Sequence, residues 1–159
     1  MPQINEYLDT NGDGTGDNDA IGNYASAAED FYFQATTLSE IHRLLVTVED
    51  TQPMQAANYG NGIVLTNGIR IFLHDSTTVT EVPLDGGLPV LRNLDWGSLC
   101  YDVDLKTWGS GNQALLVRFT FARGGQPLLL DAGDRIIVRL NDSFVGLISH
   151  KFMIQGIRI

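Results

Sequence analysis

The chain has 159 residues, of which 43% are hydrophobic, 18% are charged and 17 are glycine. A single domain of this length can bury a core without disulfides or metals, and few charges with many glycines favour short strands and turns over helices. The 19 acidic and 10 basic residues give a formal net charge of -9, which argues against a direct nucleic-acid partner because phosphate backbones are bound through basic patches.

Residues 1–29 are polar and rich in glycine, and no amphipathic period runs through them. They predict an extended, irregular N-terminal arm, followed by a single β domain over residues 30–159. The first residues lack the basic start and apolar core of a signal peptide. No apolar run approaches the roughly 20 residues of a membrane helix. We therefore expect no membrane partner, and a chain that stays in the cytoplasm unless it leaves as part of an assembly.

The first predicted strands follow this arm. Residues 31–37, FYFQATT, predict a short strand, and residues 39–50 predict a longer one with Leu44, Val46 and Val48 on one face. The β-branched run at 46–48 argues against a helix there.

The middle of the chain contains the strongest turn signal. Asn67-Gly68 separates the apolar runs 63–65 and 69–75, and this dipeptide tolerates the positive φ of a type I′ turn, so it predicts a tight hairpin. Residues 78–83 alternate as an exposed strand would.

The second half contains four further predicted strands. Residues 99–109 and 113–123 alternate at a period of two and predict a hairpin with a loop of about five residues. The second, QALLVRFTFAR, is the best candidate for a central strand. Its apolar face would contain Leu115, Val117, Phe119 and Phe121. Strands are also predicted after Gly133 and over residues 147–159.

Together these signals predict about eight to ten strands, with turns every 8 to 12 residues, which is typical of an all-β, antiparallel β-sandwich. A jelly roll is the leading topology, because double-sheet Greek keys commonly hold eight strands with long crossing loops. An immunoglobulin-like sandwich and a small barrel are the alternatives.

The most specific local pattern begins at Asp9 and reads D-x-N-x-D-G. Side-chain oxygens at alternate positions, with glycine at the sixth, are what calcium requires from a single loop. The candidate metal ligands are Asp9, Asn11, Asp13, Asp17 and Asp19. The twelfth position, an acidic ligand in an EF-hand, is Ala20 here, so Asp17 or Asp19 would have to substitute in a weak site. The alternative is a solvated turn, because Asn, Asp and Gly are common loop residues.

Catalytic signatures are absent from the sequence. It contains neither a G-x-S-x-G nor a phosphate-binding G-x-x-x-x-G-K-[ST] motif,. His42, His74 and His150 lie on or beside different predicted strands and lack the spacing of a cupin-type metal site. Asp102 and Asp104 alternate on one strand, which is more typical of a solvated face than of a glycosidase pair. We expect no enzymatic activity and, apart from calcium, no cofactor.

Two tryptophans flank the strand predicted at 99–109. Trp96 and Trp108 are each followed by glycine, and loop tryptophans often stack on sugars or anchor interfaces. Filling of the core at the ends of the sandwich is the alternative role.

Four segments resemble small virion proteins of tailed bacteriophages that decorate or cement the capsid or form head fibres. They are DTNGDGTGDNDAIGNYA (9–25), YGNGIVLTNGI (59–69), NLDWGSLCYDVDLKTWGSG (93–111) and ALLVRFTFARGGQPLLLDAGDRIIVRLNDSFVGLISHKFMIQG (114–156). The resemblance therefore covers most of the chain, from Asp9 to Gly156.

This resemblance implies a non-enzymatic protein that is made in the host cytoplasm and bound to the virion through the major capsid protein. It also implies a homo-oligomer, with a trimer favoured. The acidic balance agrees with the outer capsid surface, because a face beside packaged DNA would favour neutral or basic residues. The competing hypotheses are a tail or adhesion component and a carbohydrate-binding β-sandwich, with calcium in the Asp9 loop and Trp96 or Trp108 stacking on sugar.

Overall fold

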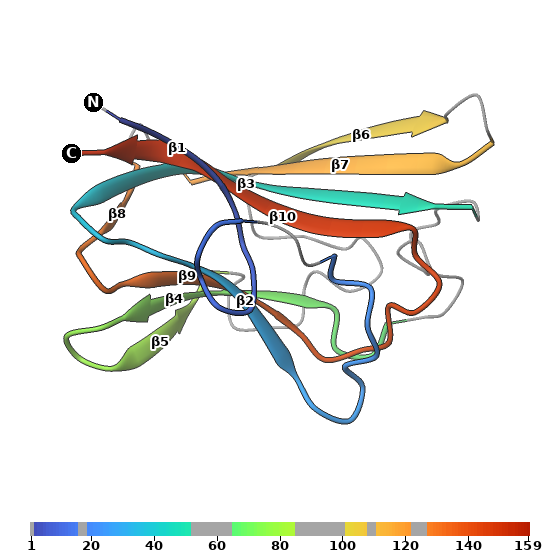
Figure 1. Ribbon diagram of the computed structural model, residues 1–159, viewed down its shortest axis with the longest axis horizontal. Helices are drawn as coiled ribbons and strands as arrows, with labels where there is room; N and C mark the ends of the chain where they lie inside the picture. Colours follow the sequence, from blue (N-terminus) through green and yellow to red (C-terminus); the bar gives the residue numbers. More distant parts are fainter. Residues whose placement is uncertain (1, 16–18, 52–64, 85–100, 108–110, 122–126) are drawn as a thin grey trace.

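The protein is an all-β sandwich of two antiparallel sheets packed face to face (Figure 1). The structure is a computed structural model that describes residues 2–15, 19–51, 65–84, 101–107, 111–121 and 127–159, with the backbone alone for 101–107. Within these residues no helix occurs, and the prediction of an antiparallel β-sandwich is confirmed.

The larger sheet has the order β1-β10-β3-β7-β6, and β8 pairs with one end of β3. Its strands are β1 (Gln3–Tyr7), β10 (Ser149–Arg158), β3 (Ser39–Asp50), β7 (Gln113–Thr120), β6 (Tyr101–Thr107) and β8 (Leu128–Leu130). The smaller sheet, seen below it in Figure 1, has the order β2-β9-β4-β5. Its strands are β2 (Glu29–Gln34), β9 (Arg135–Leu140), β4 (Ile69–Asp75) and β5 (Thr80–Pro83).

The core lies between the two sheets and is filled by alternate residues of their strands. The buried faces of β3 and β7 are those predicted by the period-two pattern, and β9 also contributes alternate residues to the core. The residues concerned are Leu44, Val46, Val48, Leu115, Val117, Phe119, Ile136, Val138 and Leu140. Phe121, predicted on the same face of β7, follows the strand and packs partly buried against this core.

The centre of the larger sheet is β3 rather than β7. β7 is an interior strand, since it pairs with β3 and β6, but β3 has β10 on one edge and both β7 and β8 on the other. The predicted hairpin of β6 and β7 is confirmed, with Thr107 opposite Gln113 at its closed end. The exposed strand predicted near residues 78–83 is confirmed as β5, all of whose residues are exposed.

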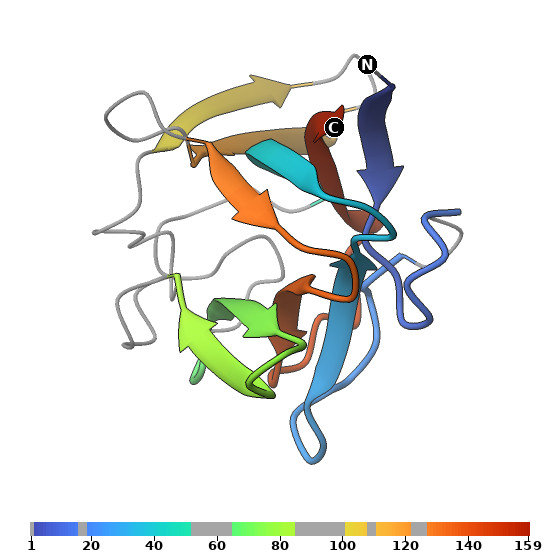
Figure 2. The ribbon, with the colours of Figure 1, turned by 90° about the vertical axis from the view of Figure 1, so that its left-hand side faces the viewer.

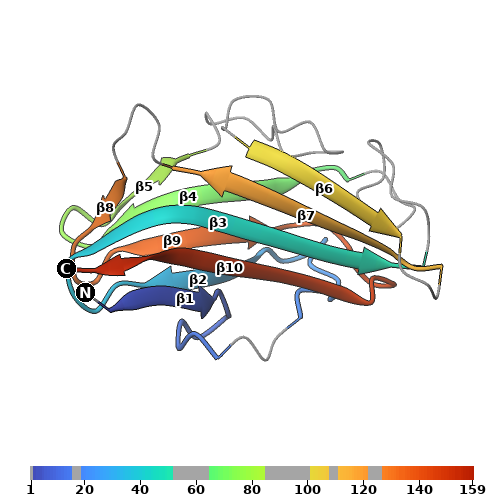
Figure 3. The ribbon, with the colours of Figure 1, turned by 90° about the horizontal axis from the view of Figure 1, so that it is seen from above.

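The prediction of an irregular arm is wrong for the first residues of the chain. Gln3–Tyr7 forms β1, an edge strand antiparallel to β10, and the two termini lie side by side at one end of the sandwich (Figures 1 and 3). Ile4 and Leu8 are only 2% exposed. Two apolar residues four positions apart are too few to reveal a strand period. The segment forms a strand because it pairs with the edge of β10, and this pairing is a tertiary contact that the local sequence does not show.

Asn67-Gly68 does form a turn with positive φ, at Gly68 (φ 72°). Part of the predicted hairpin, at residues 63 and 64, lies outside the described residues. The described partners of β4 are β9 and β5. The amides of Thr66, Asn67 and Gly68 donate to the buried carboxylate of Asp142, from 3.0, 3.0 and 2.8 Å. The turn is therefore attached to the loop that follows β9.

Replacement of Leu8 by alanine tests whether the N-terminal segment belongs to the sandwich. Because Leu8 is buried, Leu8→Ala should lower the free energy of unfolding by about 2–5 kcal/mol. Gln3→Ala, at an exposed position of the preceding strand β1, should change it by less than about 0.5 kcal/mol,. Chemical denaturation measures both values. Equal stability of Leu8→Ala and the unmodified protein would mean that β1 is a detachable arm.

Candidate functional site

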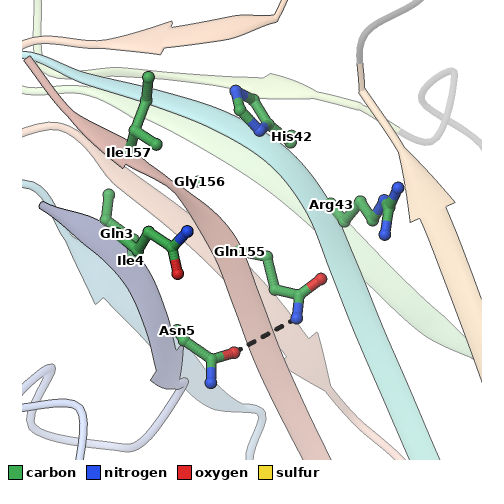
Figure 4. Close-up of a pocket in the computed structure, with 8 residues that line it drawn as sticks. All are labelled: Gln3, Ile4, Asn5, His42, Arg43, Gln155, Gly156 and Ile157. Atoms are coloured by element: carbon green, nitrogen blue, oxygen red, sulfur yellow. Dashed lines mark hydrogen bonds between the residues drawn. The ribbon is translucent and has the colours of Figure 1, made fainter. Parts of the chain in front are cut away.

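A groove of about 440 Å³ crosses β1, β10 and β3 on the outer face of the larger sheet (Figure 4). The residues that line it are Gln3, Ile4, Asn5, His42, Arg43, Gln155, Gly156 and Ile157. Its polar side chains are three carboxamides, one imidazole and one guanidinium.

A β-bulge shapes this groove. The register between β10 and β3 shifts between Gln155, opposite Arg43, and Gly156, opposite Ile41, so that His42 has no opposite residue. The buried residues Ile41 and Leu44 are consequently separated by two residues that are not buried, His42 and Arg43. A bulge of this kind turns an additional side chain to one face of a sheet, and here both side chains reach the groove.

Gly156 lies opposite the bulge because no larger residue fits there. A Cβ atom at this position would collide with the carbonyl oxygen of Glu40, which is backbone and cannot swing away. The close approach of β10 to β3 therefore requires glycine.

One hydrogen bond links two of the groove's side chains, and a third side chain lies near a carboxylate. Gln155 Nε2 donates to Asn5 Oδ1 at 3.3 Å, across the β1–β10 pair (Figure 4). His42 Nε2 lies 3.6 Å from Glu40 Oε2. Amides and imidazoles are both donors and acceptors, so the groove can bind a polar ligand or a polar segment of another protein by hydrogen bonds.

Towards the end of the same sheet lie three exposed apolar residues, here called the end patch: Leu38, Leu129 and Ile159. These side chains are 41%, 56% and 53% exposed. The amide of Ile159 donates to the carbonyl oxygen of Leu38 at 2.9 Å, and Leu129 lies opposite Glu40. Directly opposed residues and residues two apart in a strand point to the same face. The register therefore places all three on the outer face, at the end of the sheet near the termini.

The predicted calcium ligands are only partly brought together. Asp9 is buried and lies close to Asn11 and Asp13 in a tight loop. Asp19 instead accepts a hydrogen bond from Ser149 Oγ at 3.0 Å and lies 3.6 Å from Lys151 Nζ. Asp17 lies outside the described residues. Within those residues, no three side chains of His, Cys, Asp or Glu are grouped so as to hold a metal ion.

Other predicted site residues lie where the structure describes no side chain. Trp96 and Trp108 fall in segments outside the described residues, so their proposed roles stay predictions. Asp102 and Asp104 lie on β6 opposite Arg118 and Leu116.

The three histidines occupy different environments. His42 lines the groove, His74 is on β4, and His150 is buried on β10 between Phe144 and Phe152, with ring centroids 4.9 and 4.7 Å away. His150 Nδ1 lies 3.0 Å from the carbonyl oxygen of Ala20. Burial lowers the pKa of His150 to about 4, against smaller opposing effects of this hydrogen bond and of Asp19.

His150 should therefore make stability depend on pH. Its pKa is near 6.5 when unfolded and about 4 when folded, so the unfolded chain binds more protons between these values. The part of the free energy of unfolding that depends on His150 is therefore fully present above pH 6.5. It falls by about 3 kcal/mol as the pH decreases to 4. Denaturant unfolding at several pH values measures this slope. His150→Phe should lack this contribution whatever its overall stability, and an unchanged slope would contradict the assignment.

The sequence did contain one signal for the groove that the strand prediction missed. Gln3, Asn5 and Gln155 are ordinary polar residues on strands and cannot be recognised without the register. The pair His42-Arg43 is different, because two consecutive polar residues interrupt the apolar alternation of β3 between Ile41 and Leu44, as a bulge would.

Comparisons of the chain with protein-family models, with curated proteins and with solved structures found no match. The described residues contain no helix of the length and apolar character needed to span a membrane.

Proposed function

We propose that this protein is a non-enzymatic structural component of a bacteriophage virion that binds the outer surface of the capsid. In this proposal the major capsid protein is its partner, and it decorates or cements the shell through protein–protein contacts. The observation that supports it is the end patch, where three large apolar side chains from separate segments are exposed together. Exposed apolar groups with polar surroundings are typical of protein interaction sites.

The shape of the sandwich suits such an attachment. The two termini lie at the same end of the sandwich (Figures 1 and 2), and the end patch contains the C-terminal residue Ile159 with its hydrogen-bond partner Leu38. We infer that the patch faces the capsid and that the acidic surfaces face outward. We further propose a jelly-roll topology and a homo-oligomer, for which the resemblance favours a trimer.

Substitutions in the end patch test the proposed attachment. The double variant Leu129→Asp, Ile159→Asp should bind purified capsids at least tenfold more weakly, because each aspartate places a charge in an interface that buries apolar surface. Co-sedimentation with capsids measures binding, and thermal melting checks that the variant is folded.

Val82→Asp is a matched control. Val82 is 49% exposed, like the patch residues, but lies on β5 at the edge of the smaller sheet. It should retain binding. Capsids that bind the double variant and the unmodified protein at the same stoichiometry would rule out the patch as the contact surface.

The amide-lined groove favours a second candidate function, carbohydrate binding by a surface or adhesion module. Carboxamides such as Gln155 and Asn5 can donate to and accept from sugar hydroxyl groups. Gln155→Ala should then abolish binding on a glycan array, whereas Thr77→Ala, on the exposed β4–β5 turn, should not. A glycan signal that survives Gln155→Ala would exclude the groove as its origin.

A further inference from the structure

Residues 9–15 fold around the carboxyl group of Asp9. Asp9 Oδ1 accepts hydrogen bonds from the amides of Gly12 and Asp13, at 2.5 and 3.1 Å. Gly12 and Gly14 have φ of 73° and 77°, a conformation that glycine adopts without strain. The carboxyl group of Asp9 is therefore turned into the loop and held there.

The second oxygen of this carboxyl group is buried and unsatisfied. Asp9 is 0% exposed, and no donor in the described part of the chain reaches its Oδ2 atom. A buried charge without a partner is costly. A proton or a cation next to Oδ2 would complete its environment.

The same loop contains further side-chain oxygens, those of Asp13 and Asn11. Asp13 accepts a hydrogen bond from the amide of Thr15 at 2.9 Å, and Asn11 Nδ2 donates to its other oxygen at 3.0 Å. The oxygens of Asp13 and Asn11 therefore lie on the same short loop as the unsatisfied Oδ2 atom of Asp9.

Glu6 is a further carboxylate next to this loop. Its Oε2 atom lies against Gly14, so close that a Cβ atom there would approach it to 2.9 Å. Its other oxygen pairs with Arg158. Glu6 thus supports the loop without being needed as a ligand, and it was not recognisable as a neighbour from the sequence pattern.

We propose that the Asp9–Asp13 loop binds a calcium ion through the carboxylates of Asp9 and Asp13 and the amide oxygen of Asn11. An all-oxygen set without histidine or cysteine suits a hard cation, and an irregular set of this kind suits calcium better than magnesium, which demands near-ideal octahedral geometry. Main-chain carbonyl groups and water complete the coordination. Two carboxylates correspond to a weak site, with a dissociation constant on the order of 0.1–1 mM.

This site is independent of the capsid partner, so it is tested on the isolated full-length chain. If the dissociation constant is about 1 mM, 10 mM calcium should raise the melting temperature by roughly 3–5 °C relative to chelator. Magnesium at the same concentration should raise it less. Terbium, a luminescent substitute for calcium, should be sensitised by Tyr32, whose ring packs against Gly12.

Asp13→Asn and Asp9→Asn should both abolish the calcium-dependent shift and the terbium signal. Asp13 is exposed, so its variant should fold normally. Asp75→Asn is the matched control, because Asp75 also accepts hydrogen bonds from two backbone amides of its own turn, those of Thr77 and Thr78, at 2.8 and 3.1 Å. It should retain the full response.

Two results would overturn the proposal. The first is a melting temperature that is equal in calcium and in chelator, which is expected if a shared proton, rather than a cation, lies between Asp9 and Asp13. The second is a calcium response in Asp13→Asn as large as in the unmodified protein. Neither result would bear on capsid binding through the end patch.

Discussion

Pairing along both edges of β10 is the interaction on which the rest of the structure depends. One edge holds β1 and the other holds β3. The segment between β1 and β2 is attached to the same strand, since Leu8 donates to the carbonyl oxygen of Phe152 and Ala20 to that of His150, at 2.8 and 2.7 Å. The groove and the Asp9 loop therefore owe their positions to the last strand of the chain.

The acidic residues of the chain occupy two kinds of position, buried and at the surface. Among the described residues, Asp9, Asp50, Asp134 and Asp142 are buried. Asp142 and Asp134 fix the conformation of loops by accepting hydrogen bonds from backbone amides, for example those of Gly68 and Ser76 at 2.8 and 2.9 Å. These carboxylates act as anchors rather than surface charge. In the proposed function, the acidic residues that remain at the surface would face outward from the capsid.

Period-two alternation was a reliable guide wherever one face of a strand packs on the core. It correctly predicted the buried face of β3, including Leu44 and Val48, and the hairpin that joins β6 to β7. It failed for Gln3–Tyr7, where only Ile4 is buried within the strand. The structure of this edge strand depends more on the strand with which it pairs than on its own hydrophobic pattern, and that strand, β10, lies at the other end of the chain.

The sequence by itself determined the sandwich class, the buried faces of the interior strands and the close grouping of Asp9, Asn11 and Asp13, because all of these depend on neighbours within a few residues. Only the tertiary structure decided that Asp9 is buried, that Asp19 turns to Lys151, and that a groove crosses β1, β10 and β3. These features join segments up to about 150 residues apart, such as Asn5 and Gln155. Such contacts follow from strand order and register, which local periodicity does not specify.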